Sequence, residues 1–142
     1  MAKRKSSSKA VADKNGEYSN AKLYSKKHVW ALKQKNNTAL VGVTDYITDE
    51  LASIDNIDMP MVGDELEMEA FCLHLHVGSR IHHVRAPLSG RVLEINEDIE
   101  DAPCLIHINP NDTWLFKMEY DDEGEMDLLL NGDQYAKFLD QL

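Results

Sequence analysis

The sequence predicts a small, mostly β domain with short helices near both ends, arranged as a sandwich or barrel. Short apolar runs recur along the chain between Asn, Asp, Pro and Gly turn signals. One of these runs, residues 71–77, alternates apolar and polar side chains at the period of a strand. Helical spacing is confined to two segments, 45–53 and the stretch after 133. With 142 residues and 43% hydrophobic content, the chain has room for one domain with a real core.

The first predicted element is a β-hairpin in the stretch "HVWALKQKNNTALVGVTDY". Residues 29–32 and 39–43 are apolar, and the segment between them, 33–38, is polar and reads as a turn. Trp30 and, later in the chain, Trp114 are predicted core or half-core residues.

Two helices are predicted from capping signals and spacing. Thr44 is a plausible N-cap for a helix over about 45–53, whose apolar side chains recur at helical spacing: Ile47, Leu51 and Ile54. Near the end of the chain, Asp133 can cap a helix with one apolar face formed by Tyr135, Phe138, Leu139 and Leu142.

A second hairpin is predicted around Gly78 and Ser79. Phe71, Leu73, Leu75 and Val77 alternate with Cys72, His74 and His76, which indicates a strand with an apolar inner face. If Gly78 and Ser79 form a two-residue turn, the facing pairs are Val77 with Arg80, Leu75 with His82 and His74 with His83. Three more short strands are expected in "RVLEIN", "CLIHI" and "WLFKMEY".

The charge is divided unevenly along the chain. Residues 1–27 hold eight Lys and Arg against two acidic residues, a net of +6, and the remaining 115 residues therefore carry −16 of the total of −10. A domain with this much negative charge repels phosphate backbones, so nucleic acid is not expected as a partner. Residues 1–22 are predicted to be a disordered basic tail and residues 23–142 the folded domain.

The chain shows neither an apolar run long enough to span a bilayer nor a secretory signal, so no membrane partner is expected. Its two cysteines, Cys72 and Cys104, are predicted to be reduced and buried. The expected location is cytoplasmic, with mitochondrial as the alternative.

Four of the six histidines lie on the second hairpin, whose predicted surface comprises His74, His76, Arg80, His82 and His83. Cys72, His74, His76 and His83 could approach one another on its outer face and would suit Zn²⁺ or Cu²⁺. The competing interpretation is an ordinary solvent-exposed sheet face that binds no metal. Alternate strand residues are about 7 Å apart, and no ligand motif of known spacing is present. A third is a cationic, pH-sensitive tip that docks an acidic partner.

Catalysis by Ser79 finds little support in the sequence. A nucleophile requires an oriented base and an oxyanion site, and an exposed hairpin tip supplies no enclosed pocket for them. No enzymatic activity is therefore predicted.

Six stretches in order resemble the H protein family of the glycine cleavage system: "HVWALKQ", "ALVGVTDYITDELASI", "MPMVGDELE", "APLSGRVLEIN", "WLFKMEY" and "NGDQYAKFL". The resemblance spans residues 23–142 and implies a lipoyl/biotinyl-type barrel-sandwich hybrid. It also implies a carrier whose lipoate, attached to a lysine at a hairpin tip, accepts an aminomethyl group released from glycine and visits the P, T and L proteins of the system.

In this chain the lysine position of the family falls on Ser79, with Arg80 beside it, and neither side chain can be lipoylated. Residues 36–116 contain no lysine, so the absence does not depend on the alignment. No cofactor is therefore predicted, and the chain is expected to be a non-lipoylated H-like protein. The alternative is an adaptor, scaffold or regulatory module that binds a glycine cleavage protein or another protein with an acidic surface through the His-rich hairpin.

Overall fold

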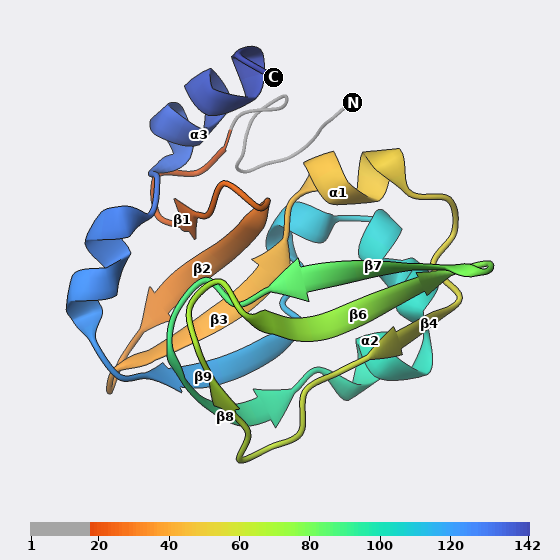
Figure 1. Ribbon diagram of the computed structural model, residues 1–142, viewed down its shortest axis with the longest axis horizontal. Coiled ribbons are helices and arrows are strands. Elements are labelled where there is room, and N and C mark those ends of the chain that lie inside the picture. Colours follow the sequence, from red (N-terminus) through yellow and green to blue (C-terminus); the bar gives the residue numbers. More distant parts are fainter. Residues whose placement is uncertain (1–17) are drawn as a thin grey trace.

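The computed structural model describes residues 18–142, and within them two β-sheets pack face to face (Figure 1). The larger sheet has six strands in the order β1-β2-β3-β9-β8-β5, and the smaller has three in the order β4-β6-β7. The strands of the larger sheet are β1 (Leu23–Tyr24), β2 (Val29–Gln34), β3 (Thr38–Val43), β5 (Glu65–Leu66), β8 (Gly90–Ile95) and β9 (Phe116–Tyr120). Those of the smaller sheet are β4 (Asn56–Asp58), β6 (Phe71–Val77) and β7 (Arg80–Arg85).

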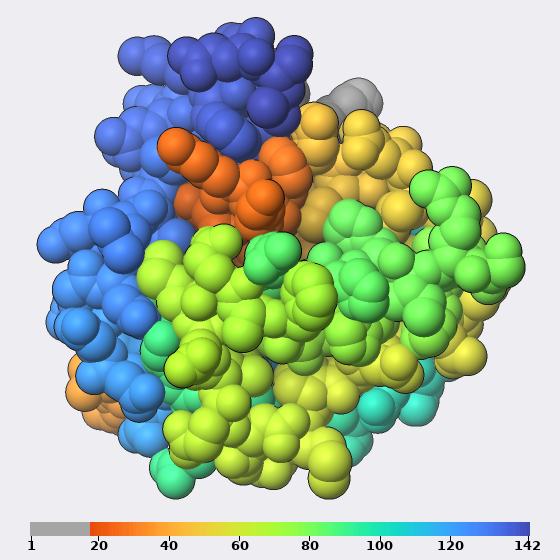
Figure 2. All heavy atoms as spheres, in the orientation of Figure 1, coloured from red at the N-terminus to blue at the C-terminus, as the bar shows by residue number. Residues whose placement is uncertain are grey.

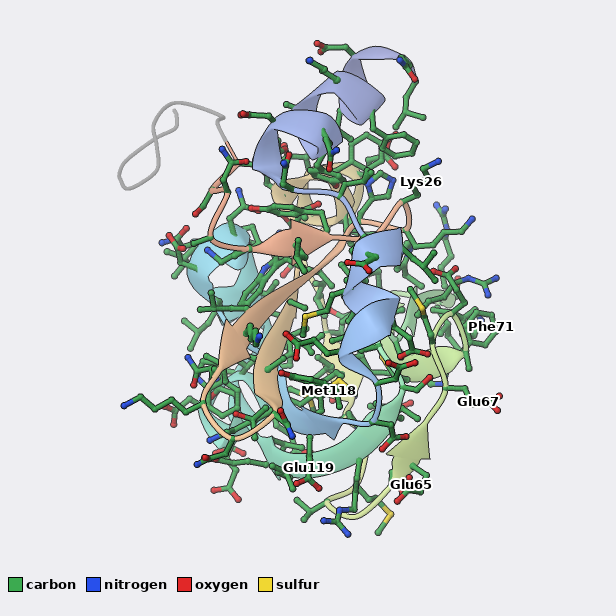
Figure 3. The ribbon with its side chains drawn as sticks, turned by 90° about the vertical axis from the view of Figure 1, so that its left-hand side faces the viewer. Lys26, Glu65, Glu67, Phe71, Met118 and Glu119 are labelled. Carbon is green, nitrogen blue, oxygen red and sulfur yellow. The ribbon has the colours of Figure 1, made fainter. Side chains whose placement is uncertain are left out.

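All strand pairs within the two sheets are antiparallel, and the predicted 29–43 hairpin is confirmed as β2 and β3. The main core lies between the sheets, where β3 and β9 contribute Val41 and Met118 and the smaller sheet contributes Leu75. Met118 has no exposed surface and lies in the interior of Figure 3, whereas Phe71 projects from the outside. The predicted fold class, a mostly β sandwich with small helices, is confirmed.

A second core cluster joins the N-terminal part of the described chain to the C-terminal helix, α3 (Gly132–Asp140). The rings of Tyr24 and Tyr135 stack with centroids 4.8 Å apart, and Tyr18 meets Tyr135 edge-on at the same distance. Gly132 is required at the start of α3 because a Cβ there would lie 1.9 Å from the carbonyl oxygen of Tyr18. These contacts bring segments more than 100 residues apart into one aromatic cluster.

The folded domain was predicted to start at residue 23, but residues before this position already pack against the rest of the chain. Tyr18 belongs to the aromatic cluster, and Lys22 forms an ion pair with Asp112 at 3.0 Å and lies over the ring of Trp30. The packed part of the chain therefore includes residues before Leu23. The predicted disorder of residues 1–17 lies outside the described residues.

Both predicted helices are present, with different ends. The first, α1 (Asp45–Glu50), begins after Thr44 as predicted but stops three residues early, and the Thr44 side chain makes no capping hydrogen bond. The N-cap of α3 is Asn131 rather than Asp133: its side chain accepts from the Gln134 amide while the Gln134 side chain accepts from the Asn131 amide. This reciprocal capping box satisfies two amides and places the N-cap two residues before Asp133, so that the helix begins at Gly132.

The prediction of a strand in "CLIHI" is wrong. Residues 104–107 lie in the 3₁₀ helix η1 (Pro103–His107), with Ile108 as its C-cap, and only Ala102 separates η1 from helix α2 (Glu97–Asp101). Pro103 occupies the first turn, where its missing amide costs nothing, and both Pro103 and Ile106 are buried and anchor the segment. Short apolar runs do not by themselves distinguish a strand from a helix.

Two further 3₁₀ helices, η2 (Pro110–Asp112) and η3 (Glu123–Leu128), complete the elements. The two cysteines are free as predicted, but they differ in exposure. Cys72 is buried, whereas Cys104 is exposed on η1, so the prediction that both are buried is wrong for Cys104. A strand would have alternated its side chains between the two faces, whereas the helical turn directs Cys104 to solvent.

Candidate functional site

The candidate site is the β6–β7 hairpin, which crosses the front of the molecule and ends with its tip at the edge of the view (Figures 1 and 2). Its register is the predicted one, with Val77 opposite Arg80, Leu75 opposite His82 and His74 opposite His83. Gly78 adopts φ of +60°, a value that favours glycine and suits the first central position of a type II′ turn. The two-residue turn is therefore confirmed.

Ser79 lies at the tip with its side chain exposed. The Gly78 amide donates to Asp55 Oδ2 at 2.7 Å, and the Asp55 amide donates to the His76 carbonyl oxygen at 2.8 Å, so the residue just before β4 holds the tip in place. No atom would lie within 4 Å of a Cβ at Gly78. The tip is thus anchored through its backbone while its side chains face open space. Among the described residues, Ser79 has no hydrogen-bonded base.

A β-bulge in β6 changes which side chains share the outer face. The register with β7 shifts between Phe71 and Leu73, so the strand alternation predicted from the sequence fails at its first two residues. Phe71, predicted to face inward, is 52% exposed, and Cys72, predicted to face outward, is 9% exposed. Burial raises the pKa of the Cys72 thiol to about 12, which keeps it protonated.

The predicted four-residue metal set is therefore not assembled. Cys72 faces the core, and the ring of His76 is held by Asp58, with 2.7 Å between Nε2 and Oδ2. Within residues 18–142, no group of three or more His, Cys, Asp or Glu side chains is arranged to hold a metal ion. Of the predicted set, the structure brings together only His74 and His83, whose Nδ1 atoms are 2.8 Å apart.

The outer face of the hairpin carries a cluster of rings and cations. Phe71 stacks on His83 with centroids 4.7 Å apart, and the guanidinium carbon of Arg85 lies 4.8 Å from the Phe71 ring centroid. Ile81 is 50% exposed next to this cluster. We call this surface, formed by Phe71, His74, Ile81, His83 and Arg85, the outer hairpin face. Figure 3 shows Phe71 projecting outward from it.

His82 does not share this face. It pairs with the fully buried Leu75, and burial lowers its pKa, with a smaller contribution from His83. Glu50 on α1 acts in the opposite direction. Arg80 is exposed and pairs with Val77 at the tip. The hairpin surface predicted as one histidine patch is thus divided by the pleat into an outer set and an inner set.

His28, which lies outside the hairpin, is also partly buried, and the sequence did not predict it as a site residue. His28 stacks on Tyr46 with centroids 4.0 Å apart, and its Nδ1 lies 2.7 Å from the hydroxyl of Tyr135. Burial, then Lys27 and then His82, lower the pKa of His28 to about 4. No signal in the sequence marks His28, because its partners lie far along the chain.

The described helices include none that is long and apolar enough to cross a membrane.

Comparison with known proteins gives consistent results. The family model for glycine cleavage H-protein matches residues 22–142. The glycine cleavage system H protein of Oceanobacillus iheyensis is 35% identical over 118 residues, covering 82% of this chain and 93% of that protein. That of Listeria monocytogenes is 34% identical over 119 residues, covering 83% and 94%. The crystal structure of a glycine cleavage system H protein from Mycobacterium marinum superposes with a TM-score of 0.74 at 23% identity, covering 87% of this chain and 98% of that one.

Proposed function

This chain belongs to the glycine cleavage H-protein family, and we propose that it is a member that carries no lipoate on its β6–β7 hairpin and works instead as a binding module. Members of this family are carriers rather than enzymes, and the resemblance implies a lipoyl-lysine at a hairpin tip. The observation that supports the proposal is Ser79 at the anchored, open tip of the hairpin.

The chemistry of attachment supports the absence of lipoate. A ligase forms an amide on a lysine ε-amine, whereas Ser79 offers a hydroxyl on a short stem, and the guanidinium of neighbouring Arg80 stays protonated. Residues 36–116 contain no lysine, so no alternative position exists near this tip in the sequence. Among the described lysines, Lys35 lies in a hairpin turn, that between β2 and β3, and it is exposed. The test below therefore treats Lys35 as the alternative attachment site for lipoate.

The test is the intact mass of the full chain after incubation with an active lipoyl ligase and lipoate. We expect no added lipoyl group on the natural chain and one added group on the Ser79→Lys variant, since the fold presents that position at an exposed tip. The matched variant Lys35→Arg keeps the charge at the other turn and should change neither result. A lipoyl adduct on the natural chain within residues 23–142 would refute the proposal, and its loss in Lys35→Arg would assign the site.

The surface chemistry of the hairpin supports a role in binding a protein. Arg85 lies over the exposed ring of Phe71, and exposed Ile81 lies on the same strand as Arg85, in a chain whose net charge is −10. An exposed aromatic and aliphatic pair bordered by arginine has the composition of interface hot spots, and the local positive charge favours an acidic partner. By the family resemblance, the candidates are the P, T and L proteins of glycine cleavage.

Binding to purified P, T and L proteins can be measured by calorimetry with the natural chain. We expect one of them to bind, and we expect Phe71→Ala and Arg85→Ala to weaken that binding by about tenfold or more. Arg91→Ala is the matched control, because Arg91 is exposed on β8 and pairs with Glu119, away from the hairpin. If none of the three proteins binds, or if the control weakens binding equally, the outer hairpin face is not the binding surface for these proteins.

A further inference from the structure

His74 and His83 form a hydrogen-bonded pair of imidazoles on the outer hairpin face. They are opposite each other in the β6–β7 ladder, their ring planes are perpendicular, and their Nδ1 atoms are 2.8 Å apart. One ring donates its Nδ1 proton and the other accepts it at its own Nδ1. Because the two residues are direct cross-strand neighbours, the backbone pairing of the sheet keeps the two side chains within reach of each other.

The surrounding side chains restrict the rings further. Phe71 stacks on His83 at 4.7 Å and meets His74 edge-on at 6.3 Å, so both imidazoles contact the same phenyl ring. Phe71 is in turn covered by Arg85, whose guanidinium donates to the Glu69 carbonyl oxygen at 2.8 Å. Rings that are already ordered lose little conformational freedom when they bind a ligand.

From this geometry we propose that His74 and His83 form a two-nitrogen chelating site for a divalent ion of square-planar preference, with Cu²⁺ as the ion bound most tightly. Two metal–nitrogen bonds of about 2.0 Å at a right angle place the nitrogens about 2.8 Å apart. A tetrahedral ion such as Zn²⁺ requires about 3.3 Å. The Nδ1 atoms, 2.8 Å apart as a hydrogen-bonded pair, can keep this separation when both bind one ion at a right angle, once each ring rotates so that its lone pair points at the ion. Among divalent first-row ions, Cu²⁺ also has the highest affinity for imidazole ligands.

Binding needs no proton release from the pair. The Nδ1 proton shared by the two rings moves to Nε2 of its own ring through solvent, and both neutral imidazoles then direct Nδ1 lone pairs to the ion. No third protein ligand is assembled among the described residues, and the nearby Arg85 is cationic, so water completes the coordination. The site is therefore a surface chelate rather than a buried metal centre, and it is independent of whether the chain is lipoylated or binds a partner.

The test is titration of the full-length Cys104→Ser chain with Cu²⁺ alone, because the exposed Cys104 thiol would otherwise react with copper. Pulsed EPR counts the imidazoles bound to the ion, and the thermal midpoint reports binding to the folded state. We expect two imidazoles per bound Cu²⁺ and a raised midpoint. His74→Ala and His83→Ala should each weaken binding by about tenfold or more and leave one imidazole.

His76→Ala and His82→Ala are the matched controls on the same hairpin. His76 is engaged with Asp58 and His82 faces inward, so both variants should bind Cu²⁺ within about twofold of the parent. Circular dichroism of all four variants should show an unchanged fold, since these side chains lie at the surface or are only partly buried. The proposal is overturned if His74→Ala and His83→Ala bind Cu²⁺ as the parent does, or if the parent spectrum shows a single imidazole.

Discussion

His28 connects the first hairpin to the C-terminal helix with an unusual backbone and several side-chain contacts. Its φ is +70°, a left-handed conformation, and its ring lies between Tyr46, on which it stacks, and the Tyr135 hydroxyl. That hydroxyl also lies 2.8 Å from Thr44 Oγ1, so one imidazole joins three segments. A neutral ring suits this environment, because burial and Lys27 oppose a charge on it.

The low pKa of His28 predicts a loss of stability in mild acid. The unfolded chain takes up the proton near the ordinary value of 6.5, while the native chain does so only near pH 4. The unfolded state therefore binds more protons between these values, and stability falls as the pH drops from about 6.5 to 4. Because the ring is only half buried, we expect a contribution of about 1 kcal/mol, below the full linkage value.

His28→Asn tests this contribution, since asparagine tolerates the left-handed backbone and does not titrate. Urea unfolding of both proteins across pH 4–7 should show the variant to be less stable at pH 7 but nearer the natural chain at pH 4. Parallel pH profiles for the two proteins would show that His28 contributes nothing to the acid sensitivity.

At the scale of elements, α3 depends on its cap and on one buried ring. The Asn131 side chain accepts from the Gln134 amide at 2.8 Å, and Tyr135 is the side chain of this helix with no exposed surface. A nine-residue helix is marginal by itself, so the cap and the Tyr135 contacts must together stabilise it.

Replacing the cap should weaken the protein by a small, defined amount. We expect Asn131→Ala to lower the free energy of unfolding by about 1 kcal/mol, the usual cost of a lost N-cap. Asn131→Asp should stay near the natural value, because a carboxylate also caps and interacts favourably with the helix N-terminus. Urea unfolding measures both. Equal losses in the two variants would indicate that Asn131 acts through something other than capping.

At the scale of the whole molecule, the excess of negative charge destabilises the folded state. Residues 28–142 carry −16, and Figure 3 shows Glu65 and Glu67 on the same side of the molecule as Phe71. Like charges at this density repel one another in the folded state, and salt screens that repulsion. The cytoplasmic location and its mitochondrial alternative stay predictions.

Salt should therefore stabilise the chain. Between about 0.01 and 0.15 M NaCl, where screening shortens from about 30 to 8 Å, we expect the thermal midpoint to rise by about 3 °C, or about 1 kcal/mol for a chain of this size. A Glu65→Gln, Glu67→Gln double variant should gain less from salt than the natural chain. A midpoint that falls with salt would mean that ion pairs such as Lys22 with Asp112 outweigh the repulsion.

The sequence by itself determined the features that depend on local pattern or on residue inventory. Alternation and the Gly78–Ser79 turn predicted the β6–β7 register correctly, because a two-residue turn leaves one pairing. The lack of lysine over residues 36–116 is a property of the covalent chain, whatever its fold.

Only the tertiary structure decided which of the predicted site residues meet. The bulge after Phe71 reversed the facing of Phe71 and Cys72, and a bulge depends on how two strands pair rather than on either strand alone. The partners of His28 are Tyr46 and Tyr135, and His82, which also lowers the pKa of His28, belongs to the other sheet. Local periodicity carries no information about such contacts, because packing between sheets, at long sequence separation, creates them.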